Sequence, residues 1–234
     1  MKTCLFITIL FVASVLASPS FAQTSTASPA TGTSATAPSP AGPGTSTAPA
    51  GAPSAEDLKK MMAQMMELAK PGENHKLLAS LDGTWSYTVK MWMNPDPTAK
   101  PDESKGTAVR KSILDGRFFV MDVTGKMEMP GPDGKKKEMT FKGMGLEGYD
   151  NVKNKFVGTW CDNMGTGIMT SEGTYDSATK TFTYTGEYEG LPGMKQKIRE
   201  VVKLTDKDHM MFEWYEDRGG KEAKTMEISY ARKK

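Results

Sequence analysis

The 234-residue chain is poor in cysteine and histidine, with two of each. Cys4 lies in the N-terminal apolar run, so once that run is removed Cys161 has no partner within the chain and an intramolecular disulfide is excluded. Net charge is also small, because 30 basic residues face 28 acidic ones. A near-neutral chain without a large basic cluster argues against nucleic acid and anionic lipid surfaces as partners.

Long hydrophobic runs are absent except at the start of the chain. Residues 1–22 carry Lys2, a continuous apolar run and then Ser20-Phe21-Ala22, a suitable cleavage site. This pattern is typical of a secretory signal peptide, because the apolar run is too short for a stop-transfer helix. We therefore expect an exported protein, periplasmic or secreted, with no membrane insertion.

Residues 23–53 lack both charge and large apolar side chains, and consist almost entirely of Ala, Ser, Thr, Pro and Gly. Such a segment cannot bury enough surface to offset the entropy of ordering, so we expect a disordered linker. Its composition is typical of a flexible, partly extended spacer, which either holds the following domain away from another structure or has no function of its own.

Residues 54–70 predict an amphipathic helix rich in methionine. Ser54 followed by Asp57 resembles a capping box, and Pro71-Gly72 ends the pattern. Apolar side chains recur at helical spacing, and we expect the helix to lie across one end of the following domain as a lid. The apolar positions are Leu58, Met61, Met62, Met65 and Leu68.

From residue 71 to residue 234 the hydrophobic period changes to two, which is typical of half-buried strands. Turn sequences such as "LDGR", "YDSATK" and "EDRGGKE" separate about ten such runs. Short connections predict an antiparallel up-and-down meander, and closure into a barrel removes its exposed edges. A phase change at Gly143 predicts a bulge in one strand.

One phase of each strand is rich in large apolar side chains, which we expect to point into the barrel. Such an interior suits a small apolar or amphipathic molecule. The alternative is a barrel filled by its own side chains that serves as a structural or interaction module of the cell envelope. The candidate ligand contacts are Tyr87, Met91, Phe119, Met121, Phe141, Trp160, Tyr184, Phe212 and Trp214.

The first and last strands of a closed meander are neighbours, which predicts a contact between their ends. Gly83 permits a tight turn into the first strand, and Trp85 would plug the barrel floor. Arg232 in the last strand could then lie across the Trp85 indole as a cation–π contact. These three residues are the predicted structural closure of the barrel.

Several segments together resemble a bacterial family of proteins, the domain-of-unknown-function 1579 family, and more distantly the lipocalin-like calycins, which open with Gly-x-Trp. The resemblance runs from about residue 70 to the C-terminus. It implies a calycin-type barrel and almost no chemistry, because the function of the family is not established. The resembling segments are "KPGENHKLLASLDGTW", "LDGRFF", "FKGMGLEGYD", "KFVGTWCD" and "MEISYARK".

Cofactor and enzyme chemistry find little support. His75 and His209 are the only histidines that could ligate haem, and neither falls in an inward strand position. The helix methionines could bind Cu(I), but their sulfurs span too wide an arc of one helix to converge. We therefore predict no cofactor, metal site or catalytic residue, and the oligomeric state stays open.

Two acids in the inward phase, Asp162 and Glu200, are the candidate carboxylates for catalysis. Arg117 and Arg199 could oppose them, although such networks in barrels are more often structural or ligand-orienting. An enzyme is therefore the third interpretation, after ligand carriage and a filled barrel.

Overall fold

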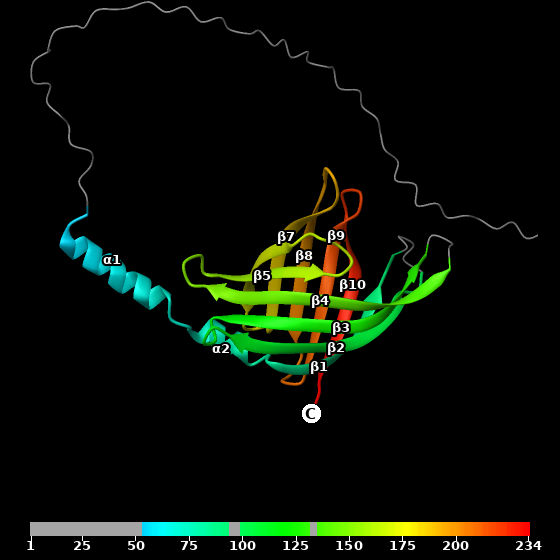
Figure 1. Cartoon of the computed structure of the whole chain (residues 1–234), viewed down its shortest axis with the longest axis horizontal. Helices are drawn as coiled ribbons and strands as arrows, with labels where there is room; N and C mark the ends of the chain where they lie inside the picture. The colour runs from blue at the N-terminus through cyan, green and yellow to red at the C-terminus, as the bar shows by residue number, and fades with distance from the viewer. Residues whose placement is uncertain (1–52, 94–98, 132–134) are drawn as a thin grey trace, which may run out of the picture. The chain divides into compact units, whose positions relative to one another are not determined.

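A computed structural model describes residues 53–93, 99–131 and 135–234, so the predicted signal peptide and most of the linker lie outside the described residues. Two helices precede ten strands (Figure 1). The elements are α1 Ala55–Leu68, α2 Glu73–Ala79, β1 Gly83–Met91, β2 Asp102–Ile113, β3 Phe118–Pro130, β4 Lys136–Asp150, β5 Lys155–Asp162, β6 Met169–Asp176, β7 Thr181–Leu191, β8 Met194–Leu204, β9 His209–Asp217 and β10 Glu222–Arg232.

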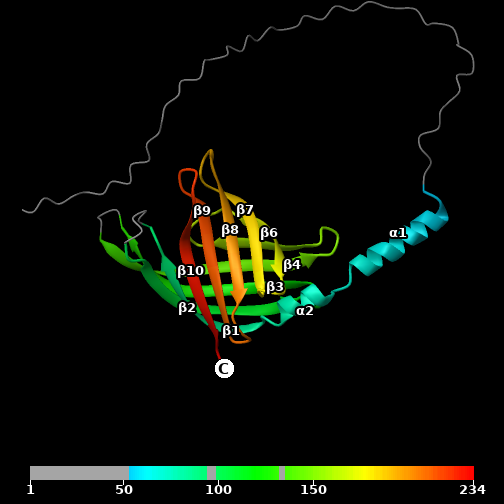
Figure 2. The ribbon, with the colours of Figure 1, turned by 180° about the vertical axis from the view of Figure 1, so that it is seen from behind.

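The ten strands form a closed antiparallel barrel in which each strand pairs with its neighbours in sequence and β1 pairs with β10. Figures 1 and 2 show β2–β4 crossing β7–β10 at a steep angle on opposite walls of the barrel. This confirms the predicted meander and its closure. No helix within the described residues is long and apolar enough to cross a membrane.

Closure joins the ends of β1 and β10 through the predicted residues. Trp85 is paired with Arg232 in the ladder, and the Arg232 guanidinium carbon lies 4.2 Å from the centroid of the Trp85 ring. Gly83 has φ of +137°, and a Cβ there would lie 2.7 Å from Arg232 Nη1. Gly83 thus supplies both the backbone conformation and the space that the arginine occupies.

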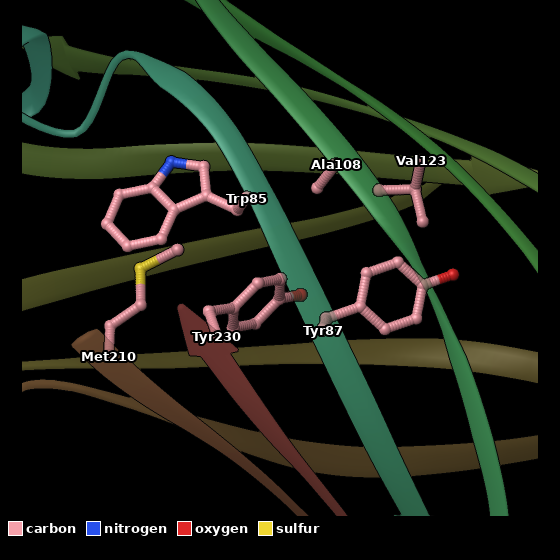
Figure 3. Close-up of a cluster of buried hydrophobic side chains, with 6 residues drawn as sticks. All are labelled: Trp85, Tyr87, Ala108, Val123, Met210 and Tyr230. Atoms are coloured by element: carbon pink, nitrogen blue, oxygen red, sulfur yellow. The ribbon is translucent and has the colours of Figure 1, made fainter. Parts of the chain in front are cut away.

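One end of the barrel is plugged by α2 and aromatic side chains. Leu78 of α2 is 1% exposed and packs in a buried cluster with Phe119, Phe156, Phe182 and Tyr184. A second buried cluster surrounds Trp85, whose indole lies beside the thioether of Met210 (Figure 3). The alternation of large apolar and polar residues along the strands produces this core.

Helix α1 begins as predicted, because Ser54 and Asp57 form both hydrogen bonds of a capping box. The expected lid is not seen. No residue of α1 is buried, and its methionines and leucines are 36% to 69% exposed. Asn151 in the β4–β5 turn donates hydrogen bonds to the carbonyls of Leu68, the last residue of α1, and of Lys70.

The predicted bulge at Gly143 is wrong. The β3–β4 register runs without a shift from Phe118 opposite Gly148 to Pro130 opposite Lys136. Phe141, Gly143 and Gly145 therefore share one face, whereas Met144 is 47% exposed. Glycine occupies position 143 because the six-membered ring of Trp160 lies where a Cβ would be. The actual register shifts lie at 189–191 in β7 and 224–226 in β10.

Candidate functional site: the barrel interior

All nine predicted ligand contacts belong to the inward phase of their strands, but the structure divides them into two groups. Tyr87, Phe119 and Tyr184 are buried in the two clusters. The other six are only half-buried, although their strands direct them into a closed barrel. Water therefore reaches part of the interior. The half-buried side chains are Met91, Met121, Phe141, Trp160, Phe212 and Trp214.

Glycines on the inner face position several of these aromatic rings. A Cβ at Gly173 would collide with the ring of Tyr184, and a Cβ at Gly106 or Gly125 would collide with the Tyr87 hydroxyl. The rings can lie flat against neighbouring strands only where a side chain is missing. These glycines fix how the inner surface is shaped, and their role as part of a binding site stays a prediction.

A polar cluster that the sequence did not predict lies among these rings. Arg110 on β2 is 3% exposed, and its Nη2 donates a 2.7 Å hydrogen bond to Glu147 on β4. The same guanidinium donates to the Leu78 carbonyl at 2.5 Å and to Asp82 at 3.2 Å, and its carbon lies 4.8 Å from the Phe119 ring centroid. Arg110 thereby links α2 to the interior acid.

The strand pattern around Arg110 contains a signal for its inward position. In "TAVRKSI" the arginine comes two positions after Ala108, which is fully buried. Residues two apart in a strand share a face, so both belong to the inward phase. Glu147 likewise comes two positions after Gly145 on β4 and shares its inward face. The predicted bulge at Gly143 assigned the opposite, outward face to Glu147. An inward arginine in a barrel wall requires a carboxylate partner, and Glu147 is the one that the register supplies.

The second interior acid is Glu200 on β8, which lies opposite Tyr184 on β7 and Trp214 on β9. Burial raises the pKa of Glu200 from 4.5 to about 7. The hydrogen bond with Ser171 lowers this pKa, and the negative charge of Glu147 raises it further. The same burial, together with both acids, raises the pKa of Tyr184 well above its usual value. The carboxyl of Glu200 is therefore poised to change charge near neutral pH.

The expected arginine partners of the acids are wrong. Arg199 belongs to the outward phase of β8, where it binds Glu222 at 2.6 Å and stacks on Tyr215. Arg117 lies in the β2–β3 turn, 3.6 Å from Asp115. Strand alternation explains the first error, since Arg199 and the inward Glu200 are adjacent in sequence and point to opposite faces. Asp162 instead accepts a 2.8 Å hydrogen bond from the Trp160 indole.

A concavity of about 1190 Å³ lies over β4–β9, and its lining includes the inward-phase residues Glu147, Ser171 and Ile198. None of the nine predicted contacts lines it. Its lining follows three adjacent rows of the ladder, and in two of these rows the side chains alternate with the buried ones and therefore point outward. Outward members include Thr159, Thr170, Thr185, Lys197 and Arg199. This surface is open to solvent.

Each histidine ring contacts a residue three positions away in sequence. His75 is buried, accepts a hydrogen bond from the Gly72 amide at 3.0 Å and packs edge-on against Tyr149. Burial lowers its pKa, which favours the neutral ring. His209 is exposed beside Asp206. Within the described residues no three His, Cys, Asp or Glu side chains gather as a metal site would require.

A family model described as a protein of unknown function, DUF1579, matches residues 70–232. No curated protein matches the chain. Among solved structures, Rv2717c from M. tuberculosis is 15% identical with a TM-score of 0.48, over 70% of this chain and all of that one. The S-type phycobiliprotein lyase CPES from Guillardia theta is 12% identical with a TM-score of 0.46, over 73% of this chain and 97% of that one. At these values neither protein informs the function.

Proposed function

Since the chain belongs to the DUF1579 family, whose function is not established, we propose a function from its own interior: the barrel binds a small apolar or amphipathic molecule. The observation that carries the proposal is the partial exposure of six large side chains that point inward. Aromatic and methionine surfaces with a few polar groups suit such a ligand.

Carriage outside the cytoplasm is the second part of the proposal. It rests on the apolar start of the chain, which has the pattern of a signal peptide, and on the uncharged linker that follows. Expression in the native host with N-terminal sequencing of the mature protein tests this part. A mature chain that begins near residue 23 supports export, whereas an intact Met1 in the cytoplasmic fraction contradicts it.

Binding can be tested with Nile red, a neutral apolar dye whose emission rises in dry surroundings. We expect micromolar binding by the wild type and a loss of at least tenfold in Met121→Trp, which fills the interior with a larger side chain. The matched control is Asp122→Trp, because Asp122 is the exposed neighbour on the same strand. Equal binding by both variants would place the dye elsewhere.

A filled barrel remains the rival function, and the buried cluster at the α2 end favours it for that half of the molecule. Native mass spectrometry of protein purified from its host separates the two. A co-purifying small molecule supports carriage. An empty spectrum together with no dye uptake by the wild type supports a filled structural module.

A further inference from the structure

One oxygen of the Glu200 carboxyl lacks the hydrogen-bond partner that its burial requires, although Ser171 also hydrogen-bonds to this carboxyl. Its Oε1 atom is buried and has no hydrogen-bond partner within the described residues. Buried carboxylate oxygens are normally paired, because burial without a partner costs several kcal/mol. The register places Tyr184 and Trp214 beside it on the neighbouring strands, and neither ring supplies a hydrogen bond to this oxygen. An unmet acceptor therefore lies on the inner wall.

Two acids of the inward phase stand apart from the ion pairs of the barrel interior. Arg110 holds Glu147, and Arg218 lies 4.0 Å from Glu216. Neither Asp162 nor Glu200, which also belong to the inward phase, forms an ion pair in the part of the chain that the structure describes. A ligand carboxylate would be repelled by these two acids, whereas a cation would offset their charge.

Small residues form the row of the ladder next to Glu200. One row of the ladder runs from Glu147 through Gly158, Ser171 and Gly186 to Ile198, and Glu200 is the next inward residue on β8. The three central members of this row carry at most a hydroxymethyl group. Glycine in a strand interior often marks a place where another group approaches the backbone closely.

We propose that Glu200 receives the protonated amino group of an amphipathic amine, whose apolar chain lies among the half-buried side chains Met121, Trp160 and Phe212. The inference rests on the proposed function and specifies its ligand class as a cationic amphiphile. The amine would donate to Oε1, and the hydroxyl of Tyr184 and the small residues of the neighbouring row would border the head group. A fatty acid is disfavoured by the same acids.

Three probes that share one apolar chain test the proposal: dodecylamine, dodecanol and dodecanoate. Each is titrated calorimetrically into the full mature chain at pH 8, the two ionic probes below their critical micelle concentrations and dodecanol below its solubility limit. We expect dodecylamine to bind at least tenfold more tightly than dodecanoate. Glu200→Gln should weaken dodecylamine at least tenfold and change dodecanol less than twofold. Glu187→Gln, which removes an exposed acid of β7, should change neither.

The outcomes separate this inference from the proposed function. Binding of dodecanol with no preference for the amine, or an unchanged amine affinity in Glu200→Gln, overturns the inference and leaves an apolar binding interior intact. No binding of any probe by the wild type overturns both. Thermal melting of each variant shows whether a loss of binding comes from unfolding, and Glu200→Asp, which retains the charge on a shorter chain, should keep more amine affinity than Glu200→Gln.

Discussion

The guanidinium of Arg232 lies over the indole of Trp85 at the point where the last strand meets the first. Arg232 donates hydrogen bonds to the carbonyls of Asp82, Ser80 and Lys207, and the Trp85 indole donates to the Leu81 carbonyl at 3.0 Å. One side chain of β10 therefore satisfies backbone groups at both ends of the α2–β1 connection. The two residues close the barrel by stacking on each other and by donating hydrogen bonds to backbone carbonyls that would otherwise need water as a donor.

Replacing this arginine should destabilise the barrel without affecting its interior. Arg232→Ala removes a cation–π contact and leaves partly buried carbonyls without donors, so we expect a loss of about 2–3 kcal/mol in the free energy of unfolding. Arg232→Lys keeps the charge but not the planar fork, and should lose less. Urea denaturation measures both, with Lys234→Ala as the exposed control. An unchanged midpoint in Arg232→Ala would show that the contact contributes nothing.

Gly83 should depend on the same arginine. Gly83→Ala places a Cβ against Arg232 Nη1 and forces a positive φ on alanine, so we expect a loss of about 1–3 kcal/mol. In the Arg232→Ala background the collision is gone, and the cost should shrink to the backbone part alone. Gly165→Ala is the control, because nothing lies within 4 Å of a Cβ there. Strictly additive losses in the double variant would contradict the contact.

The sequence specified the barrel because strand period and turn chemistry are local signals. It also specified the Trp85–Arg232 contact, since closure of a meander makes its ends neighbours. Where it failed, at Gly143, the cause was long-range. The glycine there accommodates the Trp160 ring from the adjacent strand, and hydrophobicity along β4 alone cannot distinguish this from a bulge.

The polar interior escaped sequence analysis for a related reason. An inward arginine is recognised only when its acid is known, and Arg110 and Glu147 are 37 residues apart on different strands. Arg199, adjacent to Glu200, suggested a partner by proximity in sequence, whereas the pleat directs it to the opposite face. The helix methionines gave a true helical period, but periodicity says nothing about what a helix packs against.

The environment of the methionines can be tested with one substitution at two sites. Met210→Ala opens a cavity beside Trp85 and should cost about 2–4 kcal/mol, because Met210 is 8% exposed in the core. Met65→Ala on α1 should cost less than about 0.5 kcal/mol, since Met65 is 66% exposed. Urea denaturation compares the two. A large cost at Met65 would show that α1 is covered in solution, as the lid prediction requires.

Burial of Glu200 should make stability depend on pH in a defined direction. Because the folded-state pKa of about 7 exceeds the ordinary value of 4.5, the folded protein holds a proton that the unfolded chain releases between these pH values. The free energy of unfolding should therefore fall as pH rises from about 4.5 to 7, and the penalty is complete above pH 7. The shift corresponds to roughly 3 kcal/mol.

Glu200→Gln cannot ionise and should abolish this fall. Its free energy of unfolding relative to wild type should rise by roughly 3 kcal/mol between pH 4.5 and pH 8, measured by urea denaturation at each pH.

The groups around the carboxyl are Tyr184, Trp214, Ser171 and Glu147 with its partner Arg110. Of the two acids only Glu147 has a cation to offset its charge. Glu187→Gln is the control, because it removes a carboxyl that is exposed to water in both the folded and the unfolded chain. Its free energy of unfolding should depend on pH as that of the wild type does. Parallel pH curves for wild type and Glu200→Gln would show that water or a rearranged side chain satisfies the buried oxygen, and would remove the unmet acceptor on which an amine ligand depends.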